Sequence, residues 1–97
     1  MSRKPIVKTP AFIVRLKAAL HAGLAQLDIP PTDVLFEAVP GTKLFRCRIV
    51  APKFSKLRHL ERQDLVWRLV RKELGEEGEL HISTITTLTP SEAKQVA

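Results

Sequence analysis

Cysteine is almost absent from this chain, because Cys47 is the only one among 97 residues. A single cysteine cannot form an internal disulfide and cannot build a thiolate metal site by itself. Long apolar stretches are also missing: no run approaches the roughly 18 to 20 residues that span a bilayer. The basic start of the chain is not followed by an apolar run of signal-peptide length. We therefore expect a soluble, cytoplasmic protein of a reducing compartment.

The length suits one folded unit, since 97 residues allow a single hydrophobic core but not two. Hydrophobic residues make up 44% of the chain, which is a globular composition. We expect one domain over residues 1–97, with a flexible basic segment at 1–9 and a frayed end at 93–97.

Positive charge is concentrated in one part of the chain. The formal net charge is +6, and residues 43–72 alone carry +8, whereas residues 18–42 carry −3 and residues 73–97 carry −4. Such a focused basic segment attracts phosphate groups or an acidic protein surface. An ordinary solvated surface explains the same charges equally well.

Apolar spacing predicts three helices. The pair Thr9-Pro10 predicts the start of the first helix, because threonine can cap free N–H groups and proline suits the first helical position. The stretch 28–33 predicts the end of this helix, because proline cannot continue it. Between them, apolar residues recur every three or four positions: Ile13, Leu16, Leu20, Leu24 and Leu27. A basic amphipathic helix is expected from Glu61 to Leu74, ending at Gly75 before an acidic loop. Thr89-Pro90-Ser91-Glu92 has the capping-box form and predicts a short terminal helix.

The second helix has two distinct sides. Its buried arc is expected to consist of Leu65, Val66, Leu69, Val70 and Leu74. Leu57 and Leu60 lead into it as further apolar positions, and Trp67 falls at the border between its apolar and charged sides.

Two strands are predicted to form an antiparallel hairpin, Val34 to Val39 and Leu44 to Val50, around the turn 40–43. In the second strand a period of two separates an apolar face from a basic face that carries Arg46 and Arg48. The apolar face holds Phe45, Cys47 and Ile49.

A third strand begins at Leu80. Its apolar residues do not alternate cleanly, because Ile85 has the same parity as His81 and Ser83. We therefore expect a β-bulge or an early end in this strand.

No arrangement of side chains predicts catalysis. His21, His59 and His81 are not placed beside a serine, cysteine or acid in a recognisable nucleophile arrangement. Cys47 falls on the apolar side of a strand, where cysteine usually behaves as a small hydrophobic residue. We expect a protein that is not an enzyme.

Nucleic-acid binding is the main generic alternative. KH domains clamp a nucleic-acid backbone with a Gly-x-x-Gly loop, and the only such spacing here, Gly75-Glu76-Glu77-Gly78, carries the wrong charge for phosphate. The basic turn from Lys53 to Arg62, together with the face of Arg46 and Arg48, has the right charge. It favours electrostatic binding without sequence preference.

From Phe45 to Leu74 the chain resembles the BolA-like family. The shared pattern is a strand ending in the apolar pair Ile49-Val50, a connector containing Phe54, and a helix opening on Arg62-Gln63. The closing segment from Leu80 to Glu92, a strand followed by a threonine and proline helix start, is also similar. With the leading helix included, the resemblance covers about residues 11 to 92.

The resemblance implies an α+β fold with an α-β-β-α-β core akin to a class II KH fold, in which a three-stranded mixed sheet carries helices on one face. It also implies a role in stress response and in iron–sulfur or redox homeostasis, and partnership with monothiol glutaredoxins. In that partnership a histidine of the BolA-like protein helps to ligate an iron–sulfur cluster that glutaredoxin cysteine and glutathione thiolates otherwise hold.

Two positions that would carry this chemistry hold other residues. Gln63 follows the helix arginine where the family usually has histidine, and Thr86 occupies the strand-end position of the ligand histidine. An amide or a hydroxyl is a poor replacement for imidazole as an iron ligand. His81 and His59 are the remaining candidate metal ligands. Lys56 stands where the family usually has glycine.

We expect a monomer without a cofactor of its own, and a non-enzymatic regulatory or adaptor role with a monothiol glutaredoxin as partner. The alternative is a basic KH-like module that binds nucleic acid as a transcription or stress regulator. The residues expected to bind either partner are Arg46, Arg48, Lys53, Lys56, Arg58, His59, Arg62 and Trp67.

Overall fold

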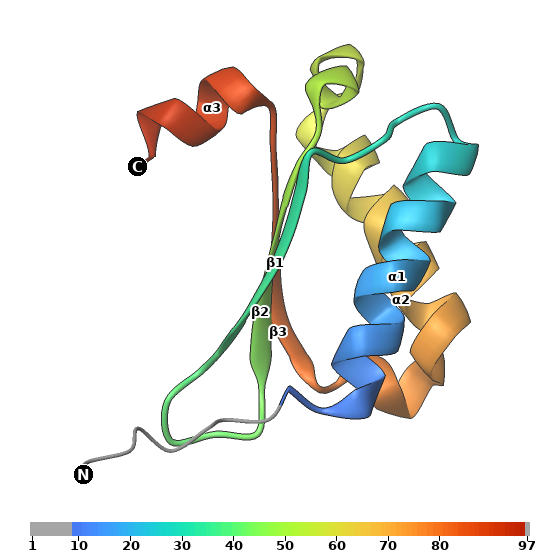
Figure 1. Ribbon diagram of the computed structural model, residues 1–97, viewed down its shortest axis with the longest axis vertical. Helices are drawn as coiled ribbons and strands as arrows, with labels where there is room; N and C mark the ends of the chain where they lie inside the picture. Colours follow the sequence, from blue (N-terminus) through green and yellow to red (C-terminus); the bar gives the residue numbers. More distant parts are fainter. Residues whose placement is uncertain (1–8, 97) are drawn as a thin grey trace, which may run out of the picture.

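Three strands and two long helices make up most of the structure, a computed structural model that describes residues 9–96 (Figure 1). In chain order the elements are α1 (Ala11–Gln26), β1 (Asp33–Ala38), β2 (Phe45–Val50), the 3-10 turn η1 (Pro52–Lys56), α2 (His59–Glu79), β3 (Ile82–Leu88) and α3 (Pro90–Gln95). The flexible segment expected at 1–9 lies outside the described residues except for Thr9. At the other end α3 continues to Gln95, beyond the point where fraying was expected. None of the helices within residues 9–96 is long and apolar enough to cross a membrane.

The sheet is mixed, with β2 in its centre. β1 pairs with β2 in antiparallel orientation, and β3 pairs with β2 in parallel orientation. α1 and α2 pack against each other on one face of the sheet, whereas α3 leaves the end of β3 on the opposite side (Figure 1). The predicted α+β class, the mixed three-stranded sheet and the α-β-β-α-β order are confirmed, and only the short α3 lies off the helical face.

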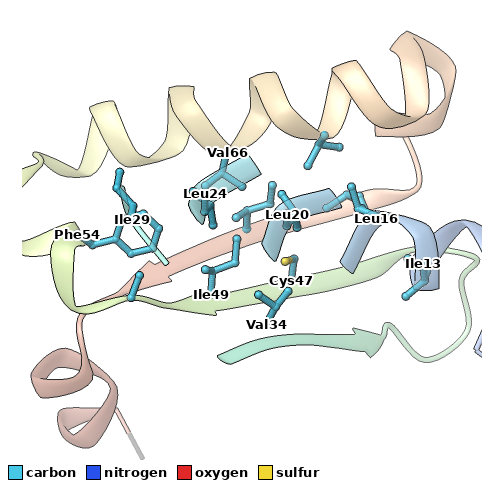
Figure 2. Packing of buried hydrophobic residues seen from close by; sticks show 14 residues of the cluster. Ile13, Leu16, Leu20, Leu24, Ile29, Val34, Cys47, Ile49, Phe54 and Val66 are labelled. Carbon is cyan, nitrogen blue, oxygen red and sulfur yellow. The ribbon is translucent and has the colours of Figure 1, made fainter. Parts of the chain in front are cut away.

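The core lies between the sheet and the two long helices, because each element presents one apolar side to the others (Figure 2). α1 contributes four members of the predicted stripe: Ile13, Leu16, Leu20 and Leu24. The fifth, Leu27, is 48% exposed and lies just beyond the end of α1 at Gln26. Phe54 of η1 is fully buried and closes one end of the core.

The irregularity predicted in the third strand is confirmed as a one-residue bulge. Phe45 pairs with Ile82, but the next residue of β2, Arg46, pairs with Thr84, so Ser83 is an extra residue in β3. The bulge shifts the side-chain alternation by one position. As a result Ile82 and Ile85 are both buried, and Thr84 and Thr86 are exposed on the other face.

The predicted helix ends are partly right. At α3, the Thr89 hydroxyl accepts a hydrogen bond from the Glu92 N–H and the Glu92 carboxylate accepts one from the Thr89 N–H, which confirms the capping box. At α1 the prediction is wrong, because Pro10 has an extended backbone and is itself the N-cap residue. Its carbonyl accepts the first helical hydrogen bonds, and the Thr9 side chain does not cap the helix.

Gly75 interrupts α2, as predicted for a helix end, and a second helical segment follows it. Its φ of 76° lies in the left-handed region, which glycine adopts with little strain. Helical hydrogen bonding resumes beyond it, so the acidic loop expected after Gly75 is a further helical turn that reaches Glu79. At the other end α2 begins at His59, where the backbone N–H of Arg58 donates to the Glu61 carboxylate.

Candidate functional site

The basic turn formed by η1 and the start of α2 holds exposed cationic side chains. Lys53 lies 2.8 Å from the Asp28 carboxylate, and this hydrogen bond and charge hold the pKa of Asp28 below its usual value. Arg58 lies 3.5 Å from Glu61, yet its side chain is 91% exposed. Ion pairs of this exposure contribute little stability. The turn therefore presents Lys56 and Arg58 to solvent, as the sequence predicted.

Arg62 does not belong to this exposed surface, and its assignment as a partner-binding residue is corrected. The residue is only 5% exposed. Its guanidinium donates to the carbonyls of Phe54, Leu57 and Thr87. It also lies 2.8 Å from the Glu92 carboxylate. Arg62 thus joins η1, β3 and α3 from inside the fold.

Gln63 and Trp67 lie at the edge of β3. The Gln63 side-chain amide donates to the Ile85 carbonyl at 2.7 Å and accepts from the Trp67 indole N–H at 3.2 Å. The contact with Trp67 follows from the geometry of α2, where residues four apart share one side of the helix, and the contact with Ile85 forms because α2 packs along β3. The amide at the position of the family's helix histidine is therefore a structural bridge between α2 and β3.

Leu60 extends this line of side chains toward the basic turn. The sequence predicts it only as an apolar position that leads into the helix, and the structure leaves it 84% exposed. Residues 60 and 67 are seven positions apart and so lie on the same side of the helix. Leu60, Gln63 and Trp67 are defined here as the α2 stripe. The exposed leucine at its start was not identifiable from sequence, because the apolar pattern alone does not distinguish it from the core residues.

Thr86 and the histidines are separated in space. Thr86 lies on the open face of the sheet, paired in register with Arg48. His81 precedes β3 and its ring lies 5.2 Å from that of Phe12, whereas His59 lies 3.8 Å from Glu92, beyond the other end of β3. A seven-residue strand spans roughly 23 Å, so the two histidines cannot share one ligand. Within residues 9–96 there is no group of three His, Cys, Asp or Glu side chains that could hold a metal ion.

Arg46 and Arg48 lie on the open face of the sheet, as the alternation predicted. Arg46 is within 3.6 Å of Glu37 on β1, and both side chains are more than half exposed. Cys47 between them points the other way, into the core (Figure 2). Burial raises the pKa of the Cys47 thiol to about 12, so this cysteine is a packing residue.

The family model and the similar solved structures point to the same family. The model of the BolA-like protein family matches residues 12–92. The structure is similar to BolA1 from Arabidopsis thaliana, with 27% identity, a TM-score of 0.62, and coverage of 87% of this chain and 98% of that chain. It is also similar to the solution structure of BolA1 from Mus musculus, with 25% identity, a TM-score of 0.58, and coverage of 99% and 80%.

A third structure shows likeness of fold. The BolA domain of SufE1 from Arabidopsis thaliana has 22% identity and a TM-score of 0.60, and the match covers 88% of this chain and 99% of that chain. Comparison with curated protein sequences gives no match.

Proposed function

Because the chain belongs to the BolA-like family, we propose that it is a non-enzymatic regulatory or adaptor domain whose partner is a monothiol glutaredoxin. One observation carries the proposal: Leu60, 84% exposed, and the half-buried Trp67 lie on the same side of α2. Exposed apolar side chains in a cluster mark interaction sites, and tryptophan is a frequent interface anchor. The α2 stripe is therefore the docking surface.

The charges around the stripe complement an acidic partner. Lys56 and Arg58 are exposed in the turn that precedes Leu60, and Arg68 is exposed one residue after Trp67. Positive charges at the rim of an interface accelerate encounter with an acidic surface and disfavour basic partners. The glutaredoxin face that binds here is accordingly expected to be acidic.

The residues at the family's cluster positions do not fit a histidine-ligated iron–sulfur cluster. Thr86 offers a hydroxyl, and the amide of Gln63 is engaged by the Ile85 carbonyl and the Trp67 indole. Neither group replaces a neutral imidazole at iron. The proposed role is therefore association with the partner, without a protein ligand from this chain to a shared cluster.

Binding is tested by calorimetric titration of a monothiol glutaredoxin, free of cluster, into the wild-type protein. We expect a Kd of about 100 μM, which is typical of a weak specific contact. Leu60→Ser should weaken it by at least about tenfold, because the exposed anchor is lost while the core is untouched. Val14→Ser is the matched control, since Val14 is 57% exposed on α1 and away from the stripe. No binding at ~100 μM, or equal losses in both variants, contradicts the proposal.

Cluster sharing is tested separately by visible absorption and circular dichroism of cluster-loaded glutaredoxin. The wild-type protein should leave the spectrum nearly unchanged, and Thr86→His should change it if residue 86 is the vacant ligand position. A wild-type spectrum that already shows histidine ligation and loses it in His81→Ala or His59→Ala would contradict this assignment.

Non-specific nucleic-acid binding is the second candidate, favoured by the exposure of Lys56 and Arg58 and by Arg48, for which residues 9–96 supply no ion pair. Binding of this kind depends on counterion release, so its affinity should fall steeply with salt and vary little with sequence. Joint replacement of Arg46, Arg48, Lys56 and Arg58 by alanine should abolish it. Tight binding at ~0.5 M salt would instead indicate base readout, which this candidate excludes.

A further inference from the structure

The sheet face opposite α1 and α2 carries a groove of about 170 Å³. Two rows of residues cross the three strands there, Leu35–Arg48–Thr86 and Glu37–Arg46–Thr84. Neighbouring strands are about 4.8 Å apart, and residues two apart along a strand are about 6.6 Å apart. The two arginines and two threonines therefore stand at the corners of a small rectangle, with all four side chains on the same face.

The electrostatics of this groove favour an anion. Arg48 makes no ion pair within residues 9–96, and its buried Nε has no hydrogen-bond partner there. Buried donors without a partner are uncommon and call for an explanation. The Arg46–Glu37 ion pair is long, at 3.6 Å, and both side chains are more than half exposed to solvent. Such a pair is weak, so a second anion can compete with the Glu37 carboxylate.

The bulge at Ser83 is what creates this arrangement. Without the extra residue, the alternation that buries Ile82 would place Thr84 and Thr86 on the helical side of the sheet. With it, both threonines are exposed on the face of Arg46 and Arg48. A threonine hydroxyl donates a hydrogen bond to an oxyanion, and the planar guanidinium matches two oxygens of one phosphate.

We propose that the groove binds a small phosphate monoester. The phosphate lies between Arg46 and Arg48 with the hydroxyls of Thr84 and Thr86 at one side, and the attached group lies against the half-exposed Leu35. Two arginines with one acidic neighbour favour a dianion over a single carboxylate. The volume is below the ~300 Å³ of a typical drug-sized site, which restricts the ligand to a compact molecule. No aromatic side chain among the described residues lines the groove, so it offers no stacking surface for a base.

The test is a ¹⁵N NMR titration of the full chain with inorganic phosphate and, separately, with glycerol phosphate, at constant ionic strength. The backbone amide resonances of Arg46, Arg48, Thr84 and Thr86 should shift, and the shifts should saturate at millimolar ligand concentrations. The monoester should bind at least as tightly as phosphate. Arg48→Met should weaken binding by at least about tenfold. Glu37→Gln should tighten it about two- to fivefold, because the competing carboxylate is removed.

Arg68→Gln is the matched control, since Arg68 is an exposed arginine paired with Asp64 at 2.7 Å on α2. It should leave binding unchanged, and the spectra of all variants report directly that they fold. Shifts spread over the basic turn, or equal losses in the Arg48 and Arg68 variants, would overturn the proposal. So would a single-stranded oligonucleotide that binds this face over a hundredfold more tightly than glycerol phosphate. Neither Leu60 nor Trp67 lines the groove, so the result does not depend on the glutaredoxin proposal.

Discussion

The Arg62 guanidinium on α2 and the Glu92 carboxylate on α3 are 2.8 Å apart and join two helices that lie on different sides of the sheet. Glu92 also accepts the backbone N–H of Thr89, so one carboxylate both caps α3 and neutralises a buried arginine. The pair therefore determines where the C-terminal helix begins and how it is held against β3.

Replacement of Arg62 by methionine should destabilise the protein by about 1.5 to 3 kcal/mol, as expected when the hydrogen bonds of a buried charged donor are lost. The variant also leaves the carbonyls of Phe54, Leu57 and Thr87 without their side-chain donor. Urea unfolding measures the change. Arg68→Gln, at an exposed position of the same helix, should change stability by less than about 0.5 kcal/mol. Similar losses in both variants would contradict the structural role of Arg62.

Glu92 predicts a specific loss of stability in acid. Hydrogen bonds from the Thr89 N–H and from Arg62 lower the pKa of Glu92 from 4.5 to about 2. Because the folded-state pKa is the lower one, its contribution is complete above about pH 4.5 and is lost as the pH falls toward 2. Glu92→Gln should lower the thermal midpoint near neutral pH, and the difference from wild type should shrink as the pH falls toward 2.

The exposed acid Glu73 provides the control for this titration. Glu73→Gln should change the thermal midpoint near neutral pH far less than Glu92→Gln does, because substitutions at exposed positions away from such contacts change stability little. A constant difference between wild type and Glu92→Gln from pH 7 to pH 2 would show that the carboxylate charge is not what stabilises the contact.

Gly75 should be sensitive to substitution because of its backbone and not because of crowding. Its φ is 76°, and an added Cβ would have no heavy atom within 4 Å. Gly75→Ala and Gly75→Asn should therefore each cost about 1 to 3 kcal/mol, since a φ of 76° combined with a ψ of 177° is a backbone conformation that essentially only glycine adopts. Chemical unfolding of the two variants gives the comparison. An alanine variant as stable as the wild type would contradict the left-handed geometry.

Cys47 should be almost unreactive in the folded protein. The thiol is 2% exposed, and its pKa is raised to about 12 by burial. Modification by a thiol reagent at pH 8 should be slow in buffer and rapid in denaturant, because the thiolate is scarce and shielded only in the folded state. Mass spectrometry follows the reaction. Rapid labelling under native conditions would mean that β2 opens far more readily than a central strand should.

Much of the candidate site was predictable from the sequence, but which residues of α2 are exposed and which are buried was not. The alternation in β2 correctly assigned Arg46 and Arg48 to a solvent face, and the break in periodicity around Ile85 correctly predicted the bulge at Ser83. The burial of Arg62 was predicted wrongly, and the exposure of Leu60 was not predicted. Both residues lie in a sequence segment where apolar and basic side chains alternate closely, and their roles depend on what lies opposite them.

By itself, the sequence determined the elements and their apolar sides. The stripe of α1, the two faces of β2 and the capping box at Thr89 depend on residues only a few positions apart, whose backbone geometry fixes their relative directions. Only the tertiary structure decided the partners of side chains that reach across the fold. Arg62 is buried because carbonyls of η1 and β3 and the carboxylate of α3 converge on it, and Gln63 meets the Ile85 carbonyl because α2 packs along β3. The partners on β3 and α3 are more than twenty residues away in the chain, and no local pattern encodes them.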